Sequence, residues 1–151
     1  MAGVLNHSAA DIICQLMLDL SLGTSYQLSL DWPVYVSQEP DSPDNCLTVY
    51  DTTPLLQGRA MIDGEVQERD GIMVRIRGAT FLEARDKAVA IAIAFDQSVE
   101  RTMVTIGSHV YRIQAISKTS GPIDLGKNVP DTKHHVFTYN ATVSVRQTTY
   151  P

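Results

Sequence analysis

The chain has 151 residues, of which 44% are hydrophobic and 19% charged, and 12 basic against 17 acidic residues give a net charge of −5. This composition is typical of a folded globular chain and excludes an intrinsically disordered one. The length predicts a single domain over residues 1–151, and the acidic balance argues against a protein that coats nucleic acid.

The two cysteines, Cys14 and Cys46, fall in an apolar helical stretch and at the start of a strand. We therefore expect buried free thiols, with a disulfide as the alternative. The N-terminus lacks the basic-then-apolar order of a secretory signal. No apolar run approaches the roughly 20 residues that cross a membrane. We expect a protein that folds in a reducing cytoplasm and does not enter a membrane.

The first predicted helix begins at Ala9, where Ser8 can cap it and Asp11 lies in the first turn, favourably placed against the helix dipole. Gly23 is the expected stop. The apolar residues recur at three- and four-residue spacing and form one stripe, which comprises Ile12, Ile13, Leu16, Met17 and Leu20.

Turn residues dominate the next stretch, since residues 30–45 contain three prolines. Residues 34–36 are a short candidate strand, and alternation over residues 46–50 predicts a half-buried one. We interpret residues 51–71 as a long polar connection, with a weak strand at residues 60–62.

Residues 72–77 alternate strictly and predict a strand. Its two faces are Ile72, Val74 and Ile76, and Met73, Arg75 and Arg77. Thr80 and Glu83 then form the T-x-x-E box that opens a second helix. The buried stripe predicted for this helix comprises Phe81, Ala84, Ala88, Ile91, Ala92 and Phe95.

The segment "MVTIGSHVYRIQAI" predicts two strands joined at Gly107 and Ser108 by a type II′ turn. Residues 117–134 are interpreted as a long loop, and alternation over residues 135–147 predicts the final strand. Together these elements predict an α+β domain: a mostly antiparallel, mixed β-sheet with two helices packed on it.

The acidic stretch "EPDSPDNCLTVYDT" is the first candidate for a chemical site. Asp41 and Asp44 could offer oxygen atoms to calcium, but the spacing, the glycine and the distal glutamate of a calcium loop are missing. Pro43 presets a turn, and both carboxylates can bond to local backbone amides. We interpret the stretch as the turn that leads into a strand.

The histidines do not have the spacing of a zinc site, and adjacent His134 and His135 would point to opposite faces of a strand. The chain also contains no Walker loop and no G-x-S-x-G motif. We therefore predict no catalytic, cofactor-binding or metal-ligating residue and no cofactor. A small enzyme that uses Asp41, Asp44 and His135 for acid–base chemistry stays as an alternative.

Two features favour contacts with other proteins. A loop over residues 117–134 would be unusually long, and it contains apolar residues that a freely solvated loop does not need. Arg75 and Arg77 share a face, which indicates either a solvated or ion-paired face or a contact with a neighbouring subunit. The residues predicted for an interface are Arg75, Arg77, Pro122, Ile123, Leu125 and Val129. A loop without a partner is the alternative.

Three segments follow one another in an informative order: "PDSPDNCLTVYDT", "MVRIRGATFLEARDKAVAI" and "HHVFTYNATVSVR". They give a turn into a strand that ends in Y-D-T, a strand that ends in R-x-R-G before an alanine-rich helix, and a closing strand. This ordered combination resembles the tail terminator (minor capsid, tail-completion) proteins of long-tailed bacteriophages, over nearly the whole chain. Thr52 and Thr53 depart from the pattern, since family members often have two glycines there.

The resemblance implies a non-enzymatic virion protein at the head–tail junction, made in the cytoplasm of the host bacterium. Such proteins form a hexameric ring on the head-proximal end of the tail tube, where they stop tube polymerisation. They bind the tail tube protein below and a neck or head-completion protein above. An acidic balance would suit a lumen through which DNA slides without specific binding. A head-side neck connector that binds the portal, commonly as a twelvefold ring, is the alternative within the same class.

Overall fold

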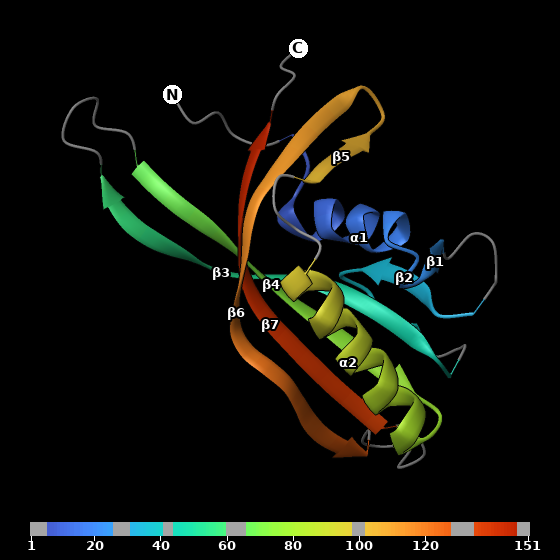
Figure 1. Cartoon of the computed structure of the whole chain (residues 1–151). Helices are drawn as coiled ribbons and strands as arrows, with labels where there is room; N and C mark the ends of the chain where they lie inside the picture. Colours follow the sequence, from blue (N-terminus) through green and yellow to red (C-terminus); the bar gives the residue numbers. More distant parts are fainter. Residues whose placement is uncertain are drawn as a thin grey trace.

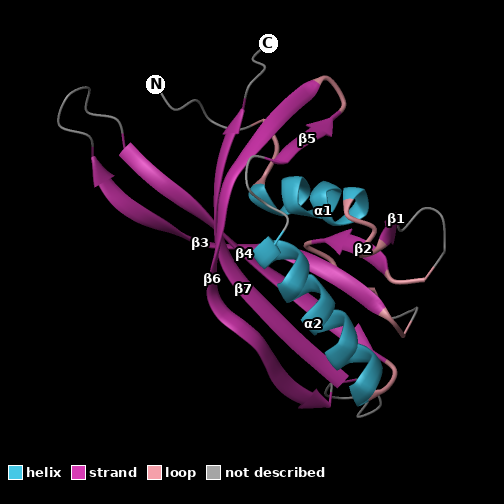
Figure 2. Cartoon of the chain, in the orientation of Figure 1, coloured by secondary structure: helices cyan, strands magenta, loops and turns pink. Residues whose placement is uncertain are grey.

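The computed structural model describes residues 6–25, 31–40, 44–59, 66–97, 102–127 and 135–147. Its elements in chain order are α1 (Ala9–Asp19), β1 (Thr24–Ser25), β2 (Pro33–Val36), β3 (Cys46–Arg59), β4 (Val66–Gly78), α2 (Phe81–Gln97), β5 (Thr102–Ile106), β6 (His109–Lys127) and β7 (His135–Gln147). The seven strands form one mixed sheet, so the predicted α+β class is confirmed (Figures 1 and 2).

The sheet has the strand order β1-β2-β3-β4-β7-β6-β5. β1, β2 and β3 pair in parallel, and the other neighbouring strands pair antiparallel. Both helices lie on the same side of the sheet, and the outer part of the β3–β4 hairpin projects beyond them (Figure 1). Within the described ranges, the other face of the sheet has no helix over it.

α1 begins as the sequence predicts. The hydroxyl of Ser8 accepts a hydrogen bond from the backbone N–H of Asp11 at 3.2 Å. The backbone N–H of Ala10 donates to the Asp51 carboxylate on β3 at 3.0 Å, which ties the helix start to the sheet. The predicted stripe faces inward: Ile12, Ile13, Leu16 and Met17 are fully buried.

The helix does not end at Gly23, as the sequence suggested. It ends at Asp19, and Ser21 takes the left-handed conformation with a φ of 58°. Gly23 is needed for close packing instead: a Cβ there would lie 2.4 Å from Val34 Cγ2 and 2.8 Å from the Trp32 carbonyl oxygen. The glycine lets the turn after α1 approach β2.

α2 begins at the predicted cap, where Thr80 Oγ1 accepts a hydrogen bond from the Glu83 N–H at 3.2 Å. Gly78 places the end of β4 directly against the helix, because a Cβ there would lie 2.8 Å from the Ala84 backbone nitrogen. The predicted burial of Phe81 is wrong. Its side chain is 45% exposed because it lies at the edge of the core, with its ring 5.7 Å from that of Phe137.

The core lies between the two helices and the sheet face beneath them. Its largest fully buried side chains are Tyr111, Tyr139, Ile12, Ile13, Leu16, Met17, Leu47, Ile72, Ile76, Ile91 and Ile113. Burial of an aliphatic side chain of this size stabilises the fold by about 1.5–3 kcal/mol. The apolar registers predicted for residues 72–77 and 135–147 thus supply much of the sheet side of the core.

The interpretation of residues 51–71 as a polar connection is wrong. β3 continues to Arg59 and β4 begins at Val66, and the two strands form an antiparallel ladder along this length. Register shifts between Thr52 and Leu55 and between Leu56 and Gly58 interrupt the ladder. Because a bulge breaks the period-two pattern, alternation does not reveal these strands. The weak strand predicted at residues 60–62 lies outside the described residues.

The long loop predicted at residues 117–134 is wrong over residues 117–127. β6 continues to Lys127 and pairs with β7 as far as His135. Four register shifts lie between residues 113 and 126, and Gly121 and Pro122 fall among them, so the sequence of this strand does not alternate. Residues 128–134 lie outside the described part of the chain.

The β5–β6 hairpin is confirmed. Ile106 pairs with His109 across a two-residue turn, and Gly107 has a φ of 60°. That left-handed value at the first turn position is what a type II′ turn requires. The hairpin extends the sheet beyond β6 at the end where α1 packs on β5.

Candidate interaction surface

Cross-strand registers assign the strand side chains to the two faces of the sheet. Ile76 pairs with Leu47 and Phe137 on the core side, whereas Arg75 pairs with Thr48 and Thr138 on the opposite side. We call this opposite side the open face. Its principal side chains are Tyr50, Arg69, Met73, Arg75, Arg77, Met103, Arg112, Ile123, Asn140, Thr142, Ser144 and Arg146.

The open face concentrates positive charge in a chain whose net charge is −5. Five of the side chains that define it are arginines, and none is acidic. Arg112 and Arg146 are both exposed and lie directly opposite each other on β6 and β7. Within the described ranges neither forms an ion pair. Like charges placed directly opposite each other destabilise a sheet, so this pair has no benefit for the isolated fold.

Three of the five arginines are held by contacts within the chain. Nη1 of Arg69 donates to the Ser117 hydroxyl at 3.1 Å. Nε of Arg75 and Nη1 of Arg77 lie 3.3 and 3.9 Å from the same carboxylate oxygen of Glu39. Two guanidinium groups therefore share one carboxylate, which leaves this end of the open face positive.

Of the residues predicted for an interface, Arg77 is only 4% exposed, and its Nε donates to the Asp44 carbonyl at 3.3 Å. It therefore offers a neighbouring subunit little surface. The contacts with Glu39 confirm the alternative in which Arg75 and Arg77 form an ion-paired face.

The apolar part of the predicted interface lies on β6. Ile123 and Leu125 are 43% and 54% exposed, and Pro122 is exposed between bulges. Val129 lies outside the described residues. An interface at these positions stays a prediction.

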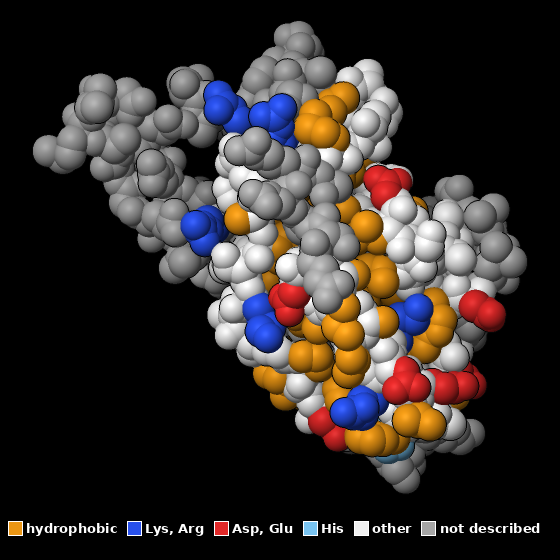
Figure 3. Space-filling model, in the orientation of Figure 1, with side chains coloured by type: hydrophobic (Ala, Val, Ile, Leu, Met, Phe, Trp, Pro, Cys, Tyr) orange, Lys and Arg blue, Asp and Glu red, His pale blue; other side chains and the backbone are white. Residues whose placement is uncertain are grey.

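The helix side of the molecule has the opposite charge. Residues of α1 and α2 include five acidic and two basic side chains, a net charge of −3. One line of exposed residues follows the outward side of α2 at helical spacing, and we call it the outer stripe: Leu82, Asp86, Ala90, Ile93 and Asp96. Figure 3 shows hydrophobic side chains gathered over α2 with both acidic and basic side chains beside them.

Of the two basic side chains on α2, Arg85 is exposed, whereas Lys87 is only partly exposed. Nζ of Lys87 donates to the Leu22 carbonyl at 2.8 Å and lies 5.2 Å from the centroid of the Trp32 ring. Burial lowers the pKa of this ammonium group. Lys87 therefore joins α2 to the turn after α1.

Of the alternative acid–base set, the structure describes Asp44 and His135. Asp44 supplies its carbonyl oxygen to Arg77, and the side chain of the adjacent Asn45 accepts a hydrogen bond from the Ala79 N–H at 2.8 Å. His135 packs its ring against Phe81, 5.8 Å away. Asp41 lies outside the described residues. Asp44 and Asn45, directly before β3, thus join the start of this strand to the β4–α2 corner.

Two other histidines meet near the β5–β6 hairpin. Nδ1 of His7 forms a hydrogen bond with the Tyr111 hydroxyl, and the His7 ring lies 5.5 Å from that of His109. Tyr111 is fully buried, and burial raises its pKa. This contact holds the segment before α1 against β6. Within the described ranges, no three His, Cys, Asp or Glu side chains come together as metal ligands would.

Both cysteines are free thiols, as predicted. Cys46 is 1% exposed and lies opposite Arg77 in the sheet. Burial raises the pKa of Cys14 and of Cys46 to about 11, from the ordinary 9.0. Both thiols therefore stay protonated near neutral pH and are poor nucleophiles. In the described chain, neither helix combines the length and the apolar character that a membrane span requires.

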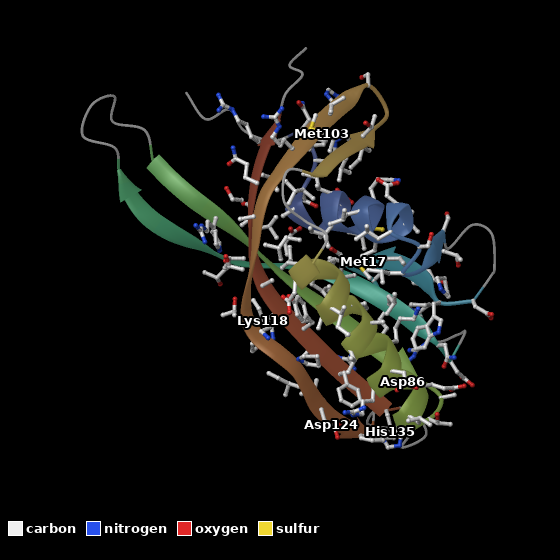
Figure 4. All side chains as sticks on the ribbon, viewed as in Figure 1. Met17, Asp86, Met103, Lys118, Asp124 and His135 are labelled. Atoms are coloured by element: carbon white, nitrogen blue, oxygen red, sulfur yellow. The ribbon has the colours of Figure 1, made fainter. Side chains whose placement is uncertain are left out.

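Sequence reasoning missed the most exposed part of the open face. Met103, Arg112 and Arg146 form one row across β5, β6 and β7. The alternation within the segments "MVTI", "VYRI" and "VSVR" does predict that these three residues point away from the core face of their strands. What the sequence could not supply is the pairing that brings the three strands together. Met103 lies at one end of the sheet, and Asp124 and His135 lie at the other (Figure 4).

Comparison of the chain with known proteins finds no family model that matches it and no curated protein that is significantly similar.

Proposed function

We propose that the chain is a tail terminator of a long-tailed bacteriophage. It forms a ring, expected to be hexameric, on the head-proximal end of the tail tube, stops tube polymerisation and provides the surface to which the head is joined. Its partners are further copies of itself, the tail tube protein and a neck protein. DNA passes through the lumen of this ring without specific binding.

The observation that supports the proposal best is where the three resembling segments fall. They supply the turn into β3, the end of β4 with α2, and β7. β3, β4 and β7 are neighbours in the sheet, and α2 packs on β4 and β7. The three segments therefore lie together in one contiguous half of the fold, including the corner where Gly78 meets Ala84.

The contacts of the polar residues in these segments support a structural role. Asn45 accepts from the Ala79 N–H, and the Asp44 carbonyl accepts from Arg77. Thr80 caps α2. Each of these side chains or carbonyls fixes the β3 turn, the β4 strand or the start of α2. Asn45, Thr80 and the backbone carbonyl of Asp44 thus hold the corner together.

Polymerisation of tail tubes in the presence of the purified chain tests the proposal. Tube protein alone should continue to elongate, and addition of the chain should arrest growth with the chain bound at one end only. Elongation that continues unchanged at saturating chain would contradict the proposal. Binding to portal rings rather than to tubes would favour a head-side neck connector.

A further inference from the structure

We infer that the outer stripe of α2 on one copy of the chain docks on the open face of a second copy. The inference rests on the proposed function, because it names the surfaces by which copies meet in the proposed ring. The part of the open face concerned is the row of Met103, Arg112 and Arg146 with the polar side chains beside it.

Charge complementarity between the two surfaces is the first argument. Arg112 and Arg146 are exposed side by side with no ion pair in the described chain. The outer stripe carries Asp86 and Asp96, with the exposed Arg85 beside them on α2, and the helices together have a net charge of −3. Carboxylates from a second copy would relieve the repulsion between the two guanidinium groups. They would also favour the placement of the second copy that brings Asp86 and Asp96 to these arginines.

Apolar surface on both sides is the second argument. On the outer stripe, Leu82 and Ile93 are 63% and 49% exposed, and residues 88–95 of α2 are all apolar. A helix that is apolar all round is typically covered on all sides. On the open face, Met103 is 45% exposed beside the two arginines. Contact between these surfaces would remove both exposed patches from water.

The positions of the two surfaces are the third argument. α2 packs on the core side of β4 and β7, and Arg146 points to the other side of β7. The outer stripe and the open face therefore look in opposite directions across the sheet. Two different complementary patches on opposite sides join copies head to tail, and such contacts close into a ring when the rotation from one copy to the next closes.

Reversal of the charge on each surface tests the inference. The double variant Arg112→Glu with Arg146→Glu makes both surfaces acidic, and Asp86→Lys with Asp96→Lys makes both basic. All four side chains are exposed, so each variant should keep its circular dichroism spectrum and its melting temperature to within a few degrees. Each variant alone should self-associate at least about tenfold more weakly than the wild type, measured by sedimentation velocity over a concentration series and on tail tubes.

Mixing the two variants gives the sharper result. Acidic open faces then meet basic outer stripes, and basic open faces meet acidic outer stripes, so the mixture should regain the wild-type assembly with the variants alternating. Lys118→Glu is the matched control. Lys118 is exposed on β6, but it pairs with Ala141 on the core register, away from the arginine row, so its reversal should weaken association less than the Arg112→Glu, Arg146→Glu variant does.

Two outcomes would overturn the inference. One is assembly by either double variant at wild-type strength, or a mixture that associates no better than its components. The other is wild-type binding to duplex DNA at physiological salt that the Arg112→Glu, Arg146→Glu variant loses, since the open face would then contact nucleic acid. Variants that still cap tubes contradict the inference and leave the proposed function intact. A wild type that neither self-associates nor caps tubes contradicts the proposed function as well.

Discussion

The two faces of the sheet differ although the same strands build both. On the core side, Ile72, Val74 and Ile76 of β4 have no exposed surface. One residue along, Met73 and Arg75 on the open face are partly exposed, and β6 and β7 there carry exposed arginines. Because successive side chains of a strand point to opposite faces, each strand contributes one set of side chains to the core and the other set to the open face.

The difference indicates which substitutions should affect folding and which should affect assembly. Core-side positions contribute free energy of unfolding through burial, whereas the exposed open-face positions Met103, Arg112 and Arg146 contribute little to it and are available for contacts between molecules. The comparison fails if a core-side change is harmless or an open-face change unfolds the chain.

Truncation of a core-side residue should have the largest effect. Ile76→Ala removes a fully buried side chain between Leu47 and Phe137, and we expect the free energy of unfolding to fall by about 2–5 kcal/mol. Urea denaturation followed by circular dichroism measures it. On the open face, Met103→Ala is the matched control and should change stability by no more than about 0.5 kcal/mol.

A change at the corner of β4 and α2 should have the next largest effect. Gly78→Ala places a Cβ 2.8 Å from the Ala84 nitrogen, and overpacking against backbone costs about 1–3 kcal/mol. Gly121→Ala is the control, because its nearest neighbour would be Lys118 Cδ at 3.9 Å. Equal melting temperatures for the two variants would show that the corner yields and is not tightly packed.

Two buried tyrosines should respond in opposite directions to loss of the hydroxyl. The Tyr139 hydroxyl is buried with no hydrogen-bond partner in the described chain, whereas that of Tyr111 bonds to His7. Tyr139→Phe should raise the free energy of unfolding by about 1 kcal/mol, and Tyr111→Phe should lower it by a similar amount. Chemical denaturation of both variants tests this, and a loss of stability in Tyr139→Phe would reveal a partner for that hydroxyl.

Substitution on β6 should have the smallest effect on folding. Replacement of both Ile123 and Leu125 by Ser removes half-exposed apolar groups, so the free energy of unfolding should change by no more than about 1 kcal/mol. Ring formation or tube capping should weaken, which gel filtration and imaging of tubes would measure. Unfolding of the variant would instead place this part of β6 in the core.

The sequence predicts those elements whose period is unbroken. The Ser8 cap, the stripe of α1 and the alternation around Ile76 and Tyr139 are local patterns, and all appear in the structure. The strands around Thr52 and Pro122 are missed because bulges shift the register there. The burial of Arg77 depends on Glu39, which lies far away in the sequence.

The sequence predicts only part of the open face, because pairing between distant strands brings its residues together. The sequence marks Ile123 and Leu125 as interface candidates because they are apolar in a polar stretch, although it assigns them to a loop. The row of Met103, Arg112 and Arg146 exists only once β5, β6 and β7 pair in this register. No local pattern gives that register, because the bulges in β6 shift its pairing with β7.

The central claim is that copies of this chain form a ring at one end of a tail tube. Its most direct test is the mass of the purified chain by light scattering, alone and after mixing with tail tubes, with images of the tube ends. The account predicts sixfold density of the chain at one end of each tube. Absence from the tubes, together with a twelvefold ring bound to portal, would contradict it.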